Sequence, residues 1–140
     1  MNSLLLTDFY KVSHPFQYPK GTEYVFSNLT ARKSRIPEID SVVVFGLQYF
    51  LDHYLVDQFN TNFFNRSEDE VVREYARICK ECVGGLPSYQ HIRDLHRLGY
   101  LPIKIRAFPE GTRVKIGVPM LTIVNTLPEF YWVTNFIESL

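Results

Sequence analysis

The chain has 140 residues, 46% of them hydrophobic, which suits one domain with a buried core and excludes a disordered chain. Fifteen basic residues balance fifteen acidic ones, which excludes the strong positive field of a general nucleic-acid or membrane-surface binder. No run approaches the roughly 18 consecutive apolar residues of a membrane span, and Leu4 to Leu6 are too few for a secretory signal, so we expect a cytoplasmic protein with neither membrane nor nucleic acid as partner.

The first forty residues predict a short helix, a turn and a strand. Leu4–His14 is expected to be helical and to end at Pro15, because proline disfavours helical geometry in the residue before it. The Tyr18-Pro19-Lys20-Gly21 stretch is typical of a turn. Thr22–Leu29 alternates rings with small polar groups and predicts a strand, and Ala31–Asp40 is a polar, basic connection.

Helical spacing dominates the middle of the chain. The apolar residues of Val42–Leu55 predict a mostly buried helix. In the next helix, Ser67 and Glu70 have the spacing of a capping box, and the glycine pair at 84–85 is expected to end it. A further helix is predicted over Ser88–Leu98.

After that helix the hydrophobic period changes from helical to alternating. Ile103, Ile105 and Ala107 alternate with basic residues, which predicts a strand with one wet or ligand-facing side. A turn at 109–111, a second alternation at Val114 and Ile116, and a strand at 121–124 complete an expected antiparallel meander.

The final segment predicts another helix. Pro128 suits a first helical turn, and Val133, Phe136, Ile137 and Leu140 form an apolar stripe that stops without a cap. We therefore expect residues 1–140 to be a fragment of a longer protein or one chain of a split protein. The predicted fold class is α+β, with an opening helix, an early strand, a helical middle, the meander and a truncated last helix.

The common catalytic and metal-binding motifs are absent from the sequence. Cys79 and Cys82 form a lone CxxC inside an amphipathic helix, without the second pair that a structural zinc requires, so they are interpreted as core or half-buried thiols. The histidines lack HExxH spacing, and His53 and His96 are interpreted as helix-surface or satisfied core residues. No glycine-rich phosphate loop or nucleophile elbow occurs.

Two clusters are better candidates for binding. Residues 7–11, Thr-Asp-Phe-Tyr-Lys, gather a carboxylate, two rings and an ammonium within about one and a half helical turns. Residues 32–35, Arg-Lys-Ser-Arg, follow a predicted strand, and guanidinium groups there could hold phosphate. Spacing alone leaves the simpler interpretations open, namely an amphipathic helix and a solvated loop.

Four stretches in this order resemble the nicotinamide phosphoribosyltransferases. The opening resemblance covers residues 4–14 and Gln17-Tyr18-Pro19, and the second covers Phe45-Gly46-Leu47-Gln48-Tyr49. The third runs from Leu101-Pro102-Ile103-Lys104-Ile105 to Pro109-Glu110-Gly111, and the fourth from Asn125 to Asn135. Together they span nearly the whole chain.

The resemblance implies a glycosyltransferase of pyridine nucleotide salvage, which joins nicotinamide to 5-phosphoribosyl pyrophosphate and releases pyrophosphate. Its active sites lie at a homodimer interface. There Tyr10 is expected to stack on the nicotinamide of the neighbouring subunit with Asp8 beside it, while Arg32 helps to hold the phosphoribosyl phosphate. Mg²⁺ and ATP are expected to act in the full-length enzyme. The resemblance implies that residues 1–140 are the amino-terminal domain of such an enzyme, truncated before its catalytic barrel. The family's catalytic residues come later, so this chain alone is expected to be inactive.

Two alternatives remain at this stage. Nicotinate phosphoribosyltransferases also have a Thr-Asp-x-Tyr opening, although Lys11 to His14 and the Tyr18-Pro19 pair favour the amide enzyme. The chain could instead be a non-catalytic module that binds nicotinamide or dimerises with a complete enzyme.

Overall fold

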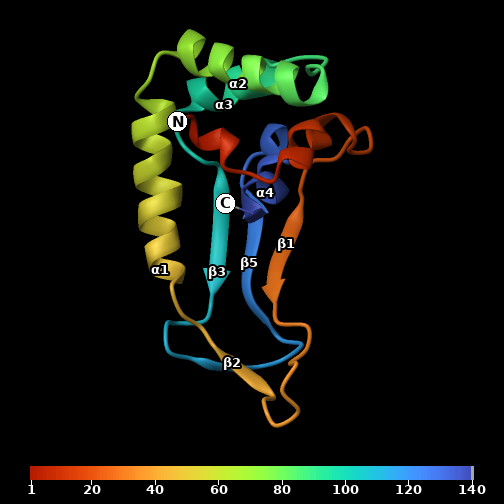
Figure 1. Cartoon of the computed structure of the whole chain (residues 1–140), viewed down its shortest axis with the longest axis vertical. Helices are drawn as coiled ribbons and strands as arrows, with labels where there is room; N and C mark the ends of the chain where they lie inside the picture. The colour runs from red at the N-terminus through yellow and green to blue at the C-terminus, as the bar shows by residue number, and fades with distance from the viewer. Residues whose placement is uncertain (140) are drawn as a thin grey trace.

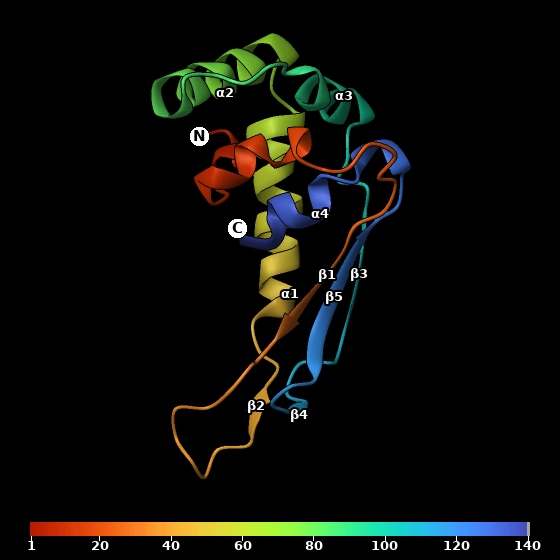
Figure 2. The ribbon, with the colours of Figure 1, turned by 90° about the vertical axis from the view of Figure 1, so that its right-hand side faces the viewer.

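A computed structural model describes residues 1–139 and has the predicted α+β class. Strands β1 (Phe26–Thr30), β5 (Pro119–Asn125) and β3 (Ile103–Ala107) form, in this order, a three-stranded sheet in the middle of the molecule (Figure 1). Helices α2 (Glu68–Val83) and α3 (Gln90–Leu98) lie at one end, and the small sheet of β2 (Ser41–Val43) and β4 (Arg113–Lys115) lies at the other. Seen from the side, the helices lie against one face of the sheet and leave the other face bare (Figure 2). Within the described residues, no helix has both the length and the apolar character needed to cross a membrane.

The opening helix forms as two short 3₁₀ helices, η1 (Ser3–Leu5) and η2 (Phe9–Phe16), which corrects the single helix predicted over Leu4–His14. Pro15 lies inside η2 and does not end it. The i→i+3 bonding continues past Pro15, from Gln17 N to His14 O at 2.9 Å, so the missing proline N–H costs only one bond. The turn after Tyr18 is confirmed by a 3.1 Å bond from Thr22 N to Pro19 O.

The second predicted helix begins later than expected. Residues Ser41–Val43 form strand β2, paired with β4 (Arg113–Lys115), because the branched side chains favour extended backbone. Gly46, at φ +86°, then redirects the chain into α1 (Leu47–Tyr49). The π-helical segments η3 (Phe50–Gln58) and η4 (Asn60–Phe64) continue α1, and the three are drawn as one long helix in Figure 1.

Helices α2 (Glu68–Val83) and α3 (Gln90–Leu98) confirm the next two predictions. The helix α2 ends at the glycine pair, where Gly84 N donates to Lys80 O and Gly85 N to Cys79 O. Ser67 is its N-cap residue but makes no side-chain capping bond. The capping box is therefore wrong in detail, since Arg66 holds the Glu70 carboxylate in an ion pair at 3.0 Å.

The predicted strands form, but strands that follow one another in the sequence do not pair with one another. Strand β5 (Pro119–Asn125) lies between β1 (Phe26–Thr30) and β3 (Ile103–Ala107), all antiparallel. Strand β4 leaves this sheet to pair with β2, so the three consecutive strands are not a meander. Strand β1 also starts later than predicted, because the Asn125 side chain takes the backbone N–H of Val25 before the ladder begins.

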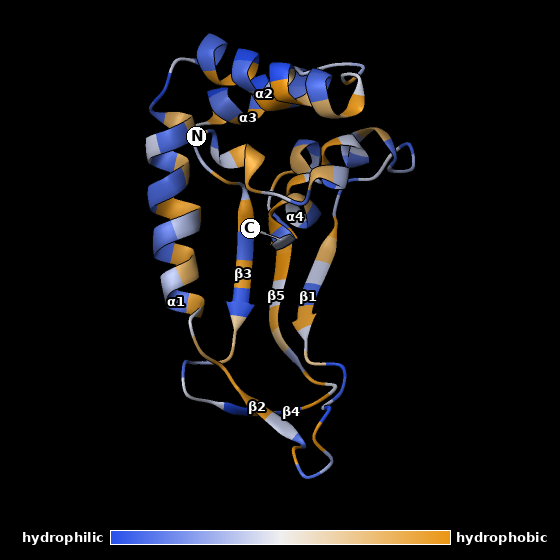
Figure 3. Cartoon of the chain, in the orientation of Figure 1, coloured by the Kyte–Doolittle hydropathy of each residue, from blue (hydrophilic) through white to orange (hydrophobic). Residues whose placement is uncertain are grey.

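The core lies between the sheet and the helices. Phe59 and Phe63 of the long helix pack with Tyr75, Ile92 and Leu95 of α2 and α3, all at most 1% exposed. Figure 3 shows that the outer side of α2 is hydrophilic, as expected for a helix buried along one stripe. The opposite face of the sheet exposes a row of side chains that confirms the predicted wet side: Phe26, Asn28, Lys104 and Arg106.

The last segment packs into the same core. Pro128 opens η5 (Pro128–Phe130), and α4 (Val133–Phe136) and η6 (Ile137–Ser139) follow. Val133, Phe136 and Ile137 are buried, which confirms the apolar stripe. Its fourth predicted member, Leu140, lies outside the described residues.

Candidate functional site

Tyr10 lies on the surface of η2. Its ring is 62% exposed and packs against the His14 ring, with 5.2 Å between centroids. The Lys11 ammonium lies 6.0 Å from the centre of the Tyr10 ring. A phenol ring held in this way offers a flat apolar face to a planar molecule outside this chain.

Asp8 is the N-cap residue of η2 and is also exposed. Its carboxylate makes no hydrogen bond to residues 1–139, whereas its backbone N–H donates to Ser139 Oγ at 3.2 Å. The carboxylate therefore remains available to a partner beside Tyr10.

The segment that carries both residues is clamped onto the end of the described chain. Thr7 Oγ1 donates to the carbonyl oxygen of Phe136 at 2.6 Å, and Lys11 Nζ donates to Glu138 Oε2 at 3.2 Å. Thr7 and Lys11 are both buried. Residues on either side of Asp8 and Tyr10 are thus fixed, while the two candidate side chains face outward.

Arg32 lies in a different part of the molecule. It is exposed in the connection that follows β1, and this connection reaches towards the β2-β4 sheet, at the end of β1 remote from η2 (Figure 1). A five-residue strand is roughly 17 Å long, so this chain does not bring Arg32 beside Tyr10. A single site that uses both side chains must therefore take them from two different parts of the assembled protein.

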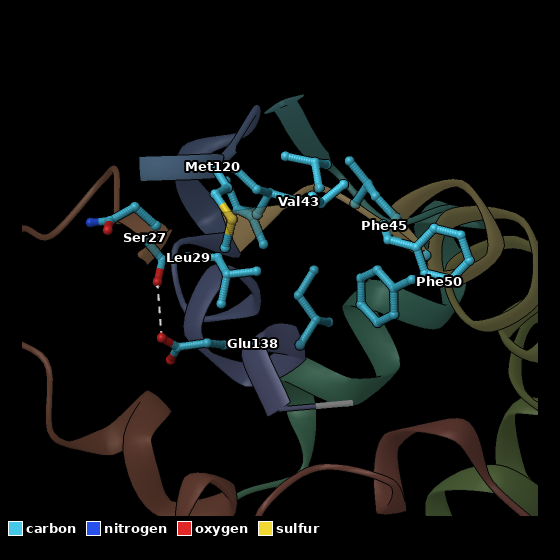
Figure 4. A pocket seen from close by; sticks show the side chains of 14 residues that line it. Ser27, Leu29, Val43, Phe45, Phe50, Met120 and Glu138 are labelled. Atoms are coloured by element: carbon cyan, nitrogen blue, oxygen red, sulfur yellow. Dashed lines mark hydrogen bonds between the residues drawn. The ribbon is translucent and has the colours of Figure 1, made fainter. Parts of the chain in front are cut away.

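An apolar groove of about 320 Å³ runs between β1, β5, the start of α1 and η6. Figure 4 shows Leu29, Val43, Phe45 and Met120 around it, with Glu138 and Ser27 joined at one end. The Phe45 side chain is 91% exposed. The predictions from sequence did not include this groove, because it is assembled from short, widely separated segments.

Burial explains the state of the thiols. Cys79 is buried, which raises the pKa of its thiol to about 11, while Cys82 is exposed. Both are free. Cys79 confirms the interpretation as a core thiol, whereas the exposed Cys82 is neither a core nor a half-buried thiol. Within residues 1–139, no group of three or more histidine, cysteine or acidic side chains is arranged to hold a metal ion.

The histidines fill packing roles. His96 of α3 bonds to the Arg66 carbonyl oxygen at 2.9 Å, and His53 stacks on Tyr49. Both fit their interpretation as surface or satisfied core residues. His91 is different, because burial between Phe16 and Trp132 lowers the pKa of its imidazole to about 4.

Known proteins resemble this chain in both fold and sequence. The fold is similar to that in the crystal structure of human nicotinic acid phosphoribosyltransferase, with a TM-score of 0.60 and 24% identity, over 95% of this chain and 24% of that one. The α+β arrangement is thus one found in a phosphoribosyltransferase. Residues 2–105 match the family described as nicotinamide phosphoribosyltransferase, N-terminal domain. The chain belongs to this family.

Curated relatives named nicotinamide phosphoribosyltransferase agree with the family match. The chain is 48% identical to the one from Acinetobacter baylyi, 35% to that from Xanthomonas campestris pv. campestris and 25% to that from Mycoplasma pneumoniae. Each alignment covers 99% of this chain. The chain spans only 28% to 34% of the length of these relatives.

Proposed function

We propose that this chain is the amino-terminal part of an enzyme that transfers the phosphoribosyl group of 5-phosphoribosyl pyrophosphate to nicotinamide. The products are nicotinamide mononucleotide and pyrophosphate, a step of NAD salvage in the cytoplasm. The observation that carries the proposal is the match of residues 2–105 to the N-terminal domain of this enzyme family. The names of the curated relatives support the same reaction.

In this proposal Tyr10 stacks on the pyridine ring of nicotinamide in the neighbouring subunit of a homodimer. The exposed ring supports that role, because a side chain that reaches across a subunit contact cannot be buried in its own monomer. Asp8 lies two residues earlier and faces solvent beside it. The clamp through Thr7 and Lys11 would hold both in position, which reduces the entropy lost when nicotinamide binds.

Arg32 is proposed to hold a phosphate of phosphoribosyl pyrophosphate through its planar guanidinium group. Its distance from η2 is compatible with a pocket built from more than one subunit, in which Tyr10 and Arg32 approach the substrates from different sides. Transfer of the ribosyl group passes through a cation-like transition state that positioning and electrostatics stabilise. These residues would bind and orient the substrates, and the catalytic groups would come from the remainder of the enzyme.

Mg²⁺ and ATP belong to the proposed full-length enzyme. The residues described in this chain do not provide a three-ligand cluster for a metal ion. We therefore assign neither a magnesium ligand nor an ATP contact to residues 1–139.

A chimera tests the proposal. Residues 1–140 would replace the matching segment of the Acinetobacter baylyi relative, and nucleotide formation would be measured with nicotinamide and with nicotinate. We expect nicotinamide mononucleotide as the main product. A preference for nicotinate would identify the acid enzyme instead. A folded chimera inactive on both bases, together with calorimetric binding of nicotinamide to the 140-residue chain, would indicate a non-catalytic module.

A further inference from the structure

Lys11 is a buried lysine next to the candidate stacking residue. Its side chain is only 3% exposed, and Nζ lies 3.2 Å from Glu138 Oε2. An ammonium removed from water is strongly unfavourable unless it is paired, so Glu138 determines where the Lys11 side chain lies. A surface ion pair of two mobile side chains would not impose this constraint.

The same carboxylate holds a second element. Ser27 Oγ donates to Glu138 Oε1 at 3.2 Å, the bond drawn in Figure 4. Ser27 lies within β1, opposite Ile123 of the central strand β5. Glu138 therefore joins η2, through Lys11, to the edge strand β1 of the three-stranded sheet.

Tyr10 has no comparable anchor of its own. Within residues 1–139, its phenol oxygen makes no hydrogen bond. Its ring lies 5.2 Å from the His14 ring, tilted by 59°, and its centre lies 6.0 Å from the Lys11 ammonium. The direction of the ring therefore depends on the backbone of η2. Lys11, the next residue, is buried and paired with Glu138, which fixes that backbone directly beside Tyr10.

We propose that Lys11 is a positioning residue for nicotinamide, which sets the orientation of Tyr10 through the Lys11–Glu138–Ser27 bridge. The inference rests on the proposed function. The bridge also connects η2 to β1, the strand that leads to the Arg32 connection. One carboxylate thus sets the relative placement of the two segments that carry the candidate substrate residues.

The test uses two single variants of the chimera. Lys11→Met keeps much of the side-chain volume, and Glu138→Gln keeps the shape but removes the charge. Lys80→Met is the matched control, since Lys80 is exposed on α2. We expect both test variants to raise KM for nicotinamide by about fivefold, within the range that loss of one ring stack explains, and to leave kcat within about twofold. The control should match the unmodified chimera.

Amide hydrogen exchange in the 140-residue chain provides an independent readout. Both test variants should accelerate exchange across residues 9–12 by about tenfold and leave α2 unchanged. An unchanged KM for nicotinamide in an active chimera, or unchanged exchange in η2, would overturn the inference. An unmodified chimera that forms no nucleotide would instead contradict the proposed function, and the exchange data would still decide whether Lys11 holds η2.

Discussion

Thr7 and Phe136 are joined by a hydrogen bond of 2.6 Å, from the threonine hydroxyl to the phenylalanine carbonyl oxygen, across 129 positions of the sequence. Both residues are buried. This bond fixes the start of the chain against α4 directly before Asp8 and Tyr10. The candidate nicotinamide contacts therefore depend on residues at both ends of the described chain.

Replacing Thr7 tests the strength of this contact. Thr7→Val keeps the shape but leaves a buried carbonyl without its donor, so we expect the free energy of unfolding to fall by about 1–3 kcal/mol. Urea unfolding of the 140-residue chain measures the change. Thr7→Ser keeps the hydroxyl and should lose less, and equal midpoints for the serine and valine variants would show that the bond contributes nothing.

The ring of Tyr10, rather than its hydroxyl, should account for nicotinamide binding. In the chimera, Tyr10→Phe should leave KM for nicotinamide within about twofold, and Tyr10→Leu should raise it up to about tenfold, since a stacked ring contributes about 0.5–1.5 kcal/mol. Steady-state rates at varied nicotinamide concentration give KM for both variants. If leucine performs as well as phenylalanine, Tyr10 does not stack on the base.

Arg32 should act on the other substrate. Because a guanidinium binds phosphate through two parallel N–H donors and an ammonium does not, Arg32→Lys should raise KM for 5-phosphoribosyl pyrophosphate despite the retained charge. Arg32→Ala should raise it further, by about tenfold or more. KM for nicotinamide should change little in both variants. A larger effect on nicotinamide than on the phosphoribosyl donor would contradict the assignment.

His91 should make the fold sensitive to mild acid. Burial lowers the pKa of its imidazole to about 4 from an ordinary value near 6.5, so the unfolded chain binds more protons between these pH values. The free energy of unfolding should therefore fall as the pH decreases from 6.5 to 4, by up to about 3 kcal/mol, and should be unaffected by His91 above pH 6.5. Comparing the pH dependence of unfolding of the wild type with His91→Phe isolates this contribution, because the variant should lose that part of the slope.

The two cysteines should differ in reactivity. Cys82 is exposed, whereas burial raises the pKa of the Cys79 thiol to about 11. Brief treatment with iodoacetamide near neutral pH should therefore add one group, at Cys82, as detected by intact mass and peptide mapping. A second addition should require urea, and rapid modification of Cys79 in the folded chain would contradict its place in the core.

Hydrophobic periodicity predicts those elements whose signal lies within their own residues. The stripe around Tyr75 and the glycine pair after Val83 defined α2, and the alternation at Ile103 and Ile105 defined β3. These signals lie within one element, so neighbouring residues report them. The α+β class followed from the same patterns.

Other features depend on contacts between distant residues, and local signals do not decide them. Val42 became a strand because β4 lies beside it, and the Ser67 capping box failed because Arg66 holds Glu70. Lys11 could be singled out from sequence as part of a polar cluster, but its burial and its pairing with Glu138 arise only in the fold. The residue types of Asp8, Tyr10 and Arg32 are compatible with an exposed position, but only the structure shows that these side chains are exposed.

Subunit complementation tests the shared pocket most directly. Chimera subunits carrying Tyr10→Leu would be mixed, after mild dissociation, with subunits disabled by substitutions in the segment contributed by the Acinetobacter baylyi relative. If Tyr10 serves the neighbouring subunit, each mixed dimer has one complete site. At nicotinamide concentrations well below KM, nucleotide formation should then rise well above the sum of the two separate preparations. Verified mixed dimers with no gain in activity would show that Tyr10 serves only its own subunit.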